Sequence, residues 1–249
     1  MSLLEARGVT QAFGSLVAIN NVSFAVEPGE LRAVIGPNGA GKTTFFNLIS
    51  GLFPPTHGSI VFDGQDITRA PAHRRVSLGI TRTFQVTEIF PELTVNQNLR
   101  IAVESAAGLR MRPWASRATR QLIANRVVEL LGAGGLLGKG RRLVGELSHG
   151  DQRATEIMMA LALKPRLLLL DEPTAGMGEQ ETRDVVRLIS KLHKTEQLTI
   201  VLIEHDMRVI FHLADRITVL AEGAVLADGA PADIAADERV QAAYLGGAQ

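Results

Sequence analysis

The nine residues GPNGAGKTT, at positions 36–44, restrict the possible folds of this chain more than any other segment. They match the pattern G-x-x-x-x-G-K-[ST], which is typical of a phosphate-binding loop. The apolar run at 31–36 predicts a buried strand before the loop, and apolar residues at helical spacing predict a short helix that ends at Gly51. A glycine-rich turn that only caps a helix is the alternative. The motif lies where a phosphate-binding loop must lie, between a buried strand and a helix, and this favours the phosphate site.

The residue types in this loop suit the binding of phosphate groups. Gly39 and Gly41 leave backbone N–H groups uncovered, so phosphate oxygens can approach them closely. Lys42 carries the positive charge for the β- and γ-phosphates, the Thr43 hydroxyl is the expected Mg²⁺ ligand, and the helix adds its positive N-terminal dipole. We therefore expect a site formed by Gly36, Pro37, Asn38, Gly39, Ala40, Gly41, Lys42, Thr43 and Thr44.

Carboxylates end a second buried strand, in the segment LLLLDEP at 167–173. Asp171 is expected to hold Mg²⁺ directly or through water, and Glu172 to orient or deprotonate an attacking water as general base. A solvated turn is the alternative for two adjacent acids. His205 ends the next strand, and although a single histidine is often structural, parallel neighbouring strands would place it at the same crevice.

The remaining patterns predict an α/β fold with a mainly parallel sheet. Alternation in residues 3–13 and 18–30 predicts antiparallel strands at the N-terminus, whereas the last third alternates buried strands with helices, as parallel sheets do. Helical spacing dominates about 94–163, where Thr94 and Gln97 form a capping-box pattern and the glycine-rich stretch 132–145 is expected to be a loop. We predict one domain over 1–249, with a core of about 1–93 and 164–249 and an inserted helical subdomain of about 94–163.

Charge and composition exclude several classes of protein. Lys and Arg together number 26, as do Asp and Glu, so no bulk field attracts nucleic acid and we expect no nucleic-acid partner. The chain has no cysteine, which excludes disulfides and thiolate metal sites. Its apolar runs are far shorter than the roughly 20 residues that span a bilayer, and the first residues do not resemble a secretory leader, so we expect a cytoplasmic location.

Taken together, these motifs resemble the nucleotide-binding subunit of ATP-binding cassette (ABC) transporters along essentially the whole chain. The resemblance implies ATP and Mg²⁺ as cofactors and an antiparallel β subdomain and an inserted helical subdomain on a P-loop NTPase core. Its five motifs stand in the family's order and spacing: GPNGAGKTT as Walker A, TFQ with Gln85 as the Q-loop, LSHGD as the signature, LLLLDEP as Walker B, and EH with His205 as the switch histidine.

The resemblance also assigns roles to individual residues. It implies that Lys42, Gln85, Glu172 and His205 act in ATP hydrolysis and that Gln85 joins Thr43 and Asp171 at the metal. Phe13 would stack on the adenine, although a core phenylalanine on an early strand is the alternative.

The segment GELSHGDQR at 145–153 begins a helix whose serine has no obvious partner. In the family, two subunits dimerise head to tail, and each signature completes the ATP site of the other subunit. Ser148 and Gly150 would then bind the nucleotide of a second cassette, either another copy or a different chain. A capping box of Ser148 and Asp151 is compatible with this role, because an exposed helix N-terminus can also bind a phosphate.

Three residues depart from the family pattern. His149 and Asp151 replace a glycine and a glutamine of the usual signature LSGGQ, and Gly178 replaces an aspartate after Walker B. An acid near the γ-phosphate weakens closure unless it is neutralised or turned away. We therefore predict that Asp151→Gln raises ATP-driven dimerisation, which sizing of the two proteins would test.

Further segments, including RTFQ, LSHG, DEPTAGMG and the ending YLGG, look most like importers of branched-chain or hydrophobic amino acids, with amide- or urea-type importers close by. This implies transmembrane permease subunits, an extracytoplasmic solute-binding protein, and a peripheral position on the cytoplasmic face of the membrane. The region from Val86 to Arg112 would offer a groove to a permease helix, although its mostly apolar segment IFPELTV fits ordinary core equally well. Import through these partners is the function that we expect.

Other functions compete with this interpretation. A small-molecule kinase would need a phosphate-acceptor pocket and an arginine-rich lid, whereas this chain has a signature and a switch histidine. Soluble ABC proteins of DNA repair or translation usually carry two cassettes or long coiled coils, and this chain has one cassette and no heptads. The ATPase of a lipid or lipopolysaccharide exporter remains a rival within the transporters.

Overall fold

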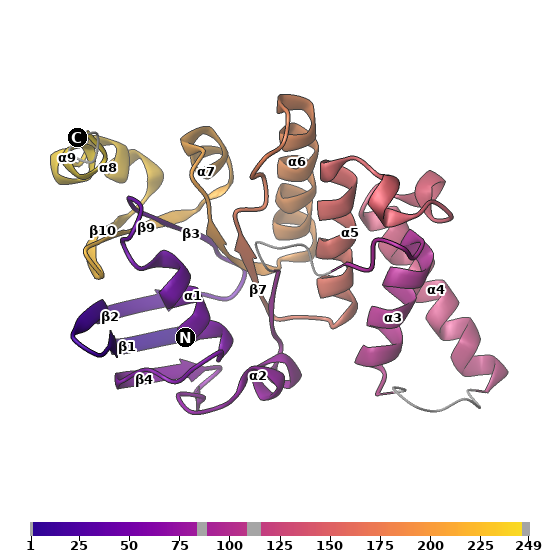
Figure 1. Cartoon of the computed structure of the whole chain (residues 1–249), viewed down its shortest axis with the longest axis horizontal. Helices are drawn as coiled ribbons and strands as arrows, with labels where there is room; N and C mark the ends of the chain where they lie inside the picture. The colour runs from indigo at the N-terminus through magenta and orange to yellow at the C-terminus, as the bar shows by residue number, and fades with distance from the viewer. Residues whose placement is uncertain (1, 84–88, 109–115, 246–249) are drawn as a thin grey trace.

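The protein is described by a computed structural model that covers residues 2–83, 89–108 and 116–245. Figure 1 shows an antiparallel sheet next to the N-terminus, a second sheet in the middle of the molecule, and a group of helices on the side away from the C-terminus. The strands are β1 (Leu4–Phe13), β2 (Leu16–Val26), β3 (Leu31–Ile35), β4 (His57–Phe62), β5 (Gln65–Asp66), β6 (Ile80–Arg82), β7 (Leu167–Asp171), β8 (Thr199–Ile203), β9 (Arg216–Ala221) and β10 (Ala224–Gly229).

The central sheet has the strand order β10-β9-β3-β8-β7-β6. Its strands run parallel except for β10, which pairs antiparallel with β9. Every residue of β3, β7 and β8 is buried, as expected for parallel strands that helices cover on both faces. The predicted α/β class with a mainly parallel sheet is confirmed.

The helices surround this sheet and continue beyond it. Those of at least six residues are α1 (Lys42–Ser50), α2 (Ala72–Leu78), α3 (Val95–Ala106), α4 (Arg117–Ala133), α5 (His149–Ala162), α6 (Glu179–Glu196), α7 (Met207–Leu213), α8 (Pro231–Ala236) and α9 (Glu238–Leu245). Across the parts of the chain that the structure describes, none of them combines the length and the apolar character that a bilayer crossing requires.

The N-terminal sheet is antiparallel, with the order β2-β1-β4-β5. Its first two strands are the pair that the sequence predicts, and β4 and β5 come from a segment for which no strand was predicted. Phe24 of β2 stacks edge-to-face on Phe45 of α1, so this sheet packs against the helix that follows the phosphate-binding loop.

The helical part consists of α3, α4 and α5, which pack on one another through one apolar cluster shared with α6 (Figure 1). The capping box of Thr94 and Gln97 forms at the start of α3 as predicted. The prediction of a plain loop at 132–145 is wrong in part, because 3-10 turns lie at Leu137–Lys139 and Val144–Glu146. Leu136 and Val144 are fully buried, so apolar anchors order this glycine-rich segment.

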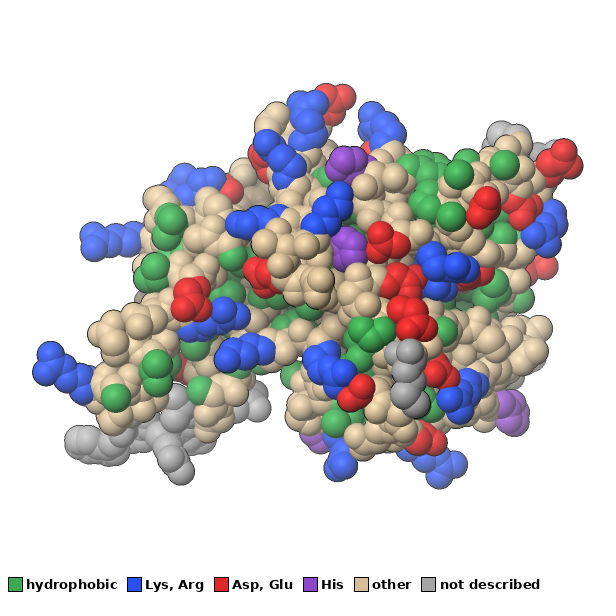
Figure 2. Space-filling view, turned by 180° about the vertical axis from the view of Figure 1, so that it is seen from behind, with side chains coloured by type: hydrophobic (Ala, Val, Ile, Leu, Met, Phe, Trp, Pro, Cys, Tyr) green, Lys and Arg blue, Asp and Glu red, His purple; other side chains and the backbone are tan. Residues whose placement is uncertain are grey.

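The face of the molecule that points away from the viewer in Figure 1 carries charges of both signs. In Figure 2, Lys and Arg side chains are interspersed with Asp and Glu side chains over the face shown. This mixture agrees with the equal numbers of acidic and basic residues in the chain.

Candidate active site

The phosphate-binding loop leaves the carboxyl end of β3 and enters α1. All three of its glycines adopt backbone conformations that L-residues rarely take, with φ of 152° at Gly36, 80° at Gly39 and 96° at Gly41. A Cβ at Gly36 would lie 2.1 Å from the carbonyl oxygen of Leu220, and one at Gly41 would lie 2.5 Å from that of Ala18. Glycine is therefore required at both positions by conformation and by space.

Lys42 lies at the start of α1, and its side chain folds back over the loop. Its Nζ donates to the carbonyl oxygens of Gly36 at 2.7 Å and Pro37 at 3.0 Å. Burial lowers the pKa of Lys42, while the carboxylates of Glu172 and Asp171 oppose this shift. The ammonium group is thus held at the loop by two carbonyls and faces the two acids that the sequence singles out.

The outer surface of the loop is open. Asn38, Gly39 and Thr43 are exposed, whereas Ala40 is buried beneath them. The N-cap of α1 is Gly41, which has no side chain to accept hydrogen bonds from the first turn. An anion at this helix end would meet uncovered N–H groups and the positive end of the helix dipole.

Asp171 ends β7 and is almost completely buried, with 1% of its surface exposed. Its Oδ2 accepts a hydrogen bond of 2.8 Å from Arg82 Nη2 at the end of β6. Arg82 Nη1 also donates to Asn47 Oδ1 of α1 at 2.5 Å. This arginine therefore joins the carboxylate of β7 to the helix of the phosphate-binding loop.

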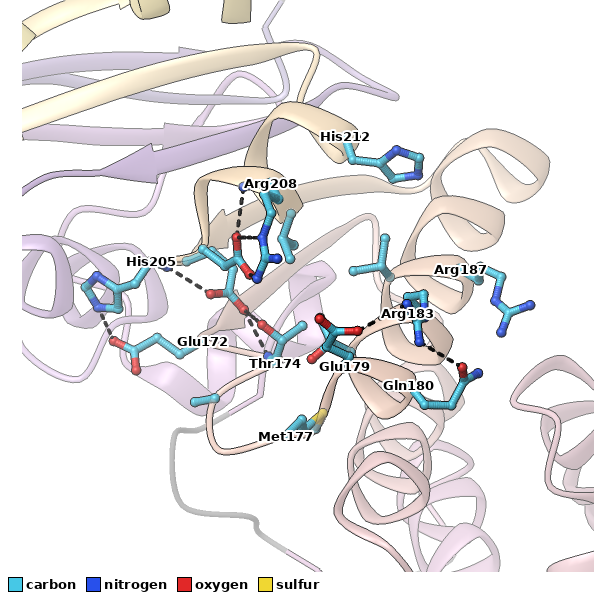
Figure 3. A pocket seen from close by; sticks show the side chains of 16 residues that line it. Glu172, Thr174, Met177, Glu179, Gln180, Arg183, Arg187, His205, Arg208 and His212 are labelled. Carbon is cyan, nitrogen blue, oxygen red and sulfur yellow. Dashed lines mark hydrogen bonds and ion pairs between the residues drawn. The ribbon is translucent and has the colours of Figure 1, made fainter. Parts of the chain in front are cut away.

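Glu172 and His205 face each other from adjacent strand ends, as the sequence predicts. Their strands β7 and β8 are parallel neighbours, and His205 Nε2 lies 2.7 Å from Glu172 Oε1 (Figure 3). Glu172 has a φ of 45°, an uncommon value for a residue with a side chain. The pair is accessible, since 46% of the His205 side chain and 19% of the Glu172 side chain are exposed.

Glu204, between β8 and His205, ties these two strand ends together. Its Oε1 accepts from the backbone N–H of Thr174 at 2.9 Å and from the Thr174 hydroxyl, and its Oε2 accepts from the backbone N–H of His205 at 2.8 Å. One buried carboxylate thus fixes the segment after Glu172 relative to the backbone of His205. Glu204, Thr174 and His205 are among the residues that line an open pocket of about 930 Å³, to which α6 and α7 also contribute (Figure 3).

Arg153 of α5 holds the same strand end from the other side. Its guanidinium donates to the carbonyl oxygens of Asp171 at 2.8 Å, Glu172 at 2.9 Å and Pro173 at 3.2 Å, and to Glu156 Oε2 at 2.6 Å. The three carbonyls belong to Glu172, whose φ is positive, and to the residues immediately before and after it. A single buried side chain therefore stabilises the turn that presents the Glu172 carboxylate.

The signature segment begins α5. The Ser148 hydroxyl accepts the Asp151 backbone N–H at 3.3 Å, but the Asp151 carboxylate turns to Lys139 Nζ, with distances of 2.7 and 2.6 Å. Only the serine half of the predicted capping box therefore forms. Ser148 and Gly150 line a pocket of about 350 Å³ next to Glu181 and Lys139, and no residue of the phosphate-binding loop lines it.

The remaining predicted site residues are Phe13 and Gln85. Phe13, at the end of β1, is 49% exposed and makes an edge-to-face contact with Phe53 at a centroid distance of 5.6 Å, so it is not a core residue. Gln85 lies outside the described residues. The structure thus brings together the loop at 36–44, Asp171, Glu172 and His205, and separates Ser148 and Gly150 from them.

Comparison with known proteins identifies the family. The family model described as ABC transporter matches residues 19–175. The chain belongs to the ABC transporter family. A second model, described as branched-chain amino acid ATP-binding cassette transporter, matches residues 224–249. The cassette is 40% identical to the high-affinity branched-chain amino acid transport ATP-binding protein BraF of Pseudomonas aeruginosa and 39% identical to LivG of Escherichia coli K12, over 98% of each chain.

Solved structures agree with this assignment. The cassette aligns with the ADP conformation of the ABC transporter cassette MJ1267 at a TM-score of 0.86 and 27% identity, over 99% of both chains. It also aligns with the dimeric post-hydrolysis structure of the cassette MJ0796 bound to ADP and phosphate, at a TM-score of 0.75 and 26% identity, over 92% of this chain and 98% of that one. The cassette is a nucleotide-binding ATP hydrolase subunit.

Sequence reasoning missed three charged residues that organise the cassette. Arg82 and Arg153 hold the end of β7, and Glu181 of α6 accepts the Gly150 backbone N–H at 3.3 Å. The contacts that matter here, with the end of β7 and with Gly150, join distant segments, so no local motif marks them. Arg153 had a weak signal, because it lies at helical spacing among the buried residues of α5, where an arginine needs partners.

Proposed function

We propose that this cassette powers the import of branched-chain or other hydrophobic amino acids through separate membrane subunits. The observation that carries the proposal is the similarity to BraF and LivG over 98% of each chain, which extends into the C-terminal segment matched at 224–249. Amide- or urea-type solutes are the alternative within the importers. A cassette does not contact the solute, so the assignment rests on similarity to the relatives.

The proposed chemistry uses the strand ends that converge on the phosphate-binding loop. The Glu172 carboxylate takes a proton from the attacking water as general base, and His205 Nε2, 2.7 Å away, holds that carboxylate in place. Lys42 and the N-terminus of α1 stabilise the negative charge that develops on the transferred phosphate. Gln85 is proposed to contact the γ-phosphate and metal, and Phe13 to stack on the adenine.

Mg²⁺ would enter this site with the ATP. The available oxygens fit it, because Mg²⁺ prefers one or two carboxylates together with substrate phosphates, and Asp171 and the exposed Thr43 hydroxyl flank the loop. No cluster of three or more His, Cys, Asp or Glu side chains that could hold a metal occurs among the residues described, which agrees with a metal held mainly by the nucleotide. When bound, Mg²⁺ would neutralise phosphate charge, and Arg82 would keep the buried Asp171 carboxylate oriented.

A second cassette would complete the site. Ser148 and Gly150 line a pocket of their own, and the MJ0796 cassette is dimeric in its post-hydrolysis structure. We propose that two cassettes pair head to tail, so that each signature binds the γ-phosphate on the other chain. The partner is a second copy or a different cassette.

The membrane partners would bind the helical part, which we propose to extend over about 94–163. A pocket of about 300 Å³ lies between α3 and α4, and its lining includes the apolar side chains of Ile123, Val127 and Val128 and the charged side chains of Arg100 and Arg120. This groove suits a helix of a permease subunit. The cassette would then lie on the cytoplasmic face of the membrane, and an extracytoplasmic solute-binding protein would deliver the solute to the permeases.

Two measurements test these proposals. The Glu172→Gln protein should lose ATP hydrolysis by at least ~100-fold and still bind ATP, because only the general base is removed. Light scattering with Mg-free ATP should show it as a dimer, and a monomer under all conditions would contradict the paired site.

The solute is tested by uptake of labelled leucine, urea and acetamide in cells with and without an intact gene for the chain. Loss of leucine uptake supports the amino acid assignment. Loss of urea or acetamide uptake alone would support the alternative importers, and unchanged uptake of all three would refute both.

A further inference from the structure

The carboxylate of Glu181 joins two segments that the proposed dimer uses. Its Oε1 accepts the backbone N–H of Gly150 in the signature at 3.3 Å, and its Oε2 accepts the backbone N–H of Gly178 at 3.2 Å. The amide of Gly150 and then that of Gly178 lower the pKa of Glu181, as expected for a carboxylate that accepts hydrogen bonds in its charged form. Glu181 is therefore an anion that rests on the signature within the same chain.

The fit between these segments depends on the absence of a side chain at position 150. A Cβ added to Gly150 would lie 3.2 Å from Glu181 Cβ, which is tighter than ordinary packing. The first turn of α6 therefore lies directly against the first turn of α5. The N-terminus of α5, which favours negative charge, receives the carboxylate of its neighbour.

The two acids near the signature differ in their partners. Asp151 is neutralised by Lys139 through two contacts of 2.6 and 2.7 Å. Within the described part of the chain, no lysine or arginine forms an ion pair with Glu181; its partners are two backbone amides and the Ser148 side chain, and His149 interacts with its charge as the weakest of these contributions. The carboxylate at the signature that is not paired with a lysine or arginine is therefore that of Glu181.

We propose that Glu181 is a positioning residue that occupies the signature amide until the γ-phosphate on a second cassette displaces it. The inference rests on the proposed dimer site. Closure must replace one anion by another at Gly150, so the Glu181 carboxylate opposes closure by competition and by repulsion. The same displacement loosens the contact between Glu181 and the Gly178 backbone N–H. Binding of a γ-phosphate at the signature thereby changes the position of the segment that follows Glu172.

The test compares single substitutions in the Glu172→Gln protein. Glu181→Gln keeps the capping of α6, because glutamine also serves at this position of a capping box, but it removes the charge. We expect the Mg-free ATP concentration at half-maximal dimerisation to fall by about 3- to 10-fold, the range expected when one nearby like charge is removed. Glu179→Gln is the matched control, since Glu179 lies in the same helical turn and pairs with Arg183, and it should change this concentration by less than about 2-fold.

A second measurement examines the contact without a dimer. In the nucleotide-free monomer, Glu181→Ala should increase hydrogen exchange of the amides at 149–152 more than Glu179→Ala does. A merely structural role would weaken dimerisation, whereas the proposal requires Glu181→Gln to strengthen it.

The possible failures are distinguishable. If the Glu172→Gln protein dimerises with ATP and Glu181→Gln leaves the half-maximal concentration unchanged or raises it, the inference is wrong and the proposed dimer stands. Unchanged hydrogen exchange in Glu181→Ala also refutes the inference. If no variant dimerises, the paired site and the inference fall together.

Discussion

The ion pair of Lys139 and Asp151 leads to a prediction in which two substitutions that break the same contact act in opposite directions. Lys139→Met leaves a carboxylate uncompensated at the signature, where the γ-phosphate of a second cassette would bind. Asp151→Asn instead leaves an ammonium group there. We expect the first substitution to weaken ATP-driven dimerisation of the Glu172→Gln protein and the second to strengthen it.

The magnitude follows from the exposure of the pair and from Coulomb's law. With 39% of the Lys139 side chain and 22% of the Asp151 side chain exposed, the pair itself contributes only about 0.5 to 1 kcal/mol to folding stability. A unit charge about 8 Å from a phosphate contributes ~0.5 to 2 kcal/mol for an effective dielectric constant between 80 and 20. Each substitution should therefore shift the dimerisation constant by roughly 2- to 30-fold per site, a free-energy change at least as large as its effect on folding stability.

The assay is sedimentation or light scattering over a series of ATP concentrations without Mg²⁺. The double variant Lys139→Met/Asp151→Asn should return close to the parent, and the shifts should shrink at high salt because exposed charges are screened. If both single variants shift dimerisation in the same direction, charge does not decide the effect. The pair then acts only as a scaffold for the first turn of α5, and the reasoning is refuted.

Three further outcomes follow from buried or constrained residues. Gly41→Ala should abolish nucleotide binding, because the added Cβ would lie 2.5 Å from the Ala18 carbonyl oxygen at a residue with a φ of 96°. Gly64 also has a positive φ, but a Cβ there would meet nothing within 4 Å, so Gly64→Ala should lower the free energy of unfolding in urea by only about 1 kcal/mol. Arg75→Met should lower the free energy of unfolding by about 3 kcal/mol or more, because this buried guanidinium donates to five carbonyl oxygens, while the exposed Arg74→Met should change it by less than ~0.5 kcal/mol. Arg153→Lys should lower kcat by roughly 10-fold with little change in KM, because the compact ammonium lacks the spread of donors by which the planar guanidinium reaches three separate carbonyls. An equal loss in nucleotide affinity would contradict this role.

Much of the fold follows from local patterns in the sequence. Buried strands such as β3 and β7 are continuous apolar runs, and the parallel arrangement of β7 and β8 brings Glu172 to His205 as predicted. The segment 132–145 was harder to predict, because its glycines suggest a loop while Leu136 and Val144 bury themselves against the helices.

The charged contacts of the site could not be predicted in this way. Arg82 meets Asp171 across 89 positions of the chain, and Gly150 meets Glu181 across 31. Such pairs depend on how α5, α6 and β6 pack in three dimensions. A residue that interacts only through tertiary packing leaves no periodicity or spacing from which its role can be inferred.

The position of α5 connects these contacts. Its first turn presents Ser148 and Gly150, and one turn later Arg153 holds the carbonyls around Glu172. A helix of 14 residues with fully hydrogen-bonded turns moves as a unit, so a shift of its N-terminus is also a shift of the guanidinium. Binding of a nucleotide at the signature would therefore alter the support of the general base in the same chain. Because Glu181 rests on the same first turn, its displacement and the adjustment of Arg153 would occur together, and the two ATP sites of a dimer would be coupled through each α5 rather than through the nucleotide alone.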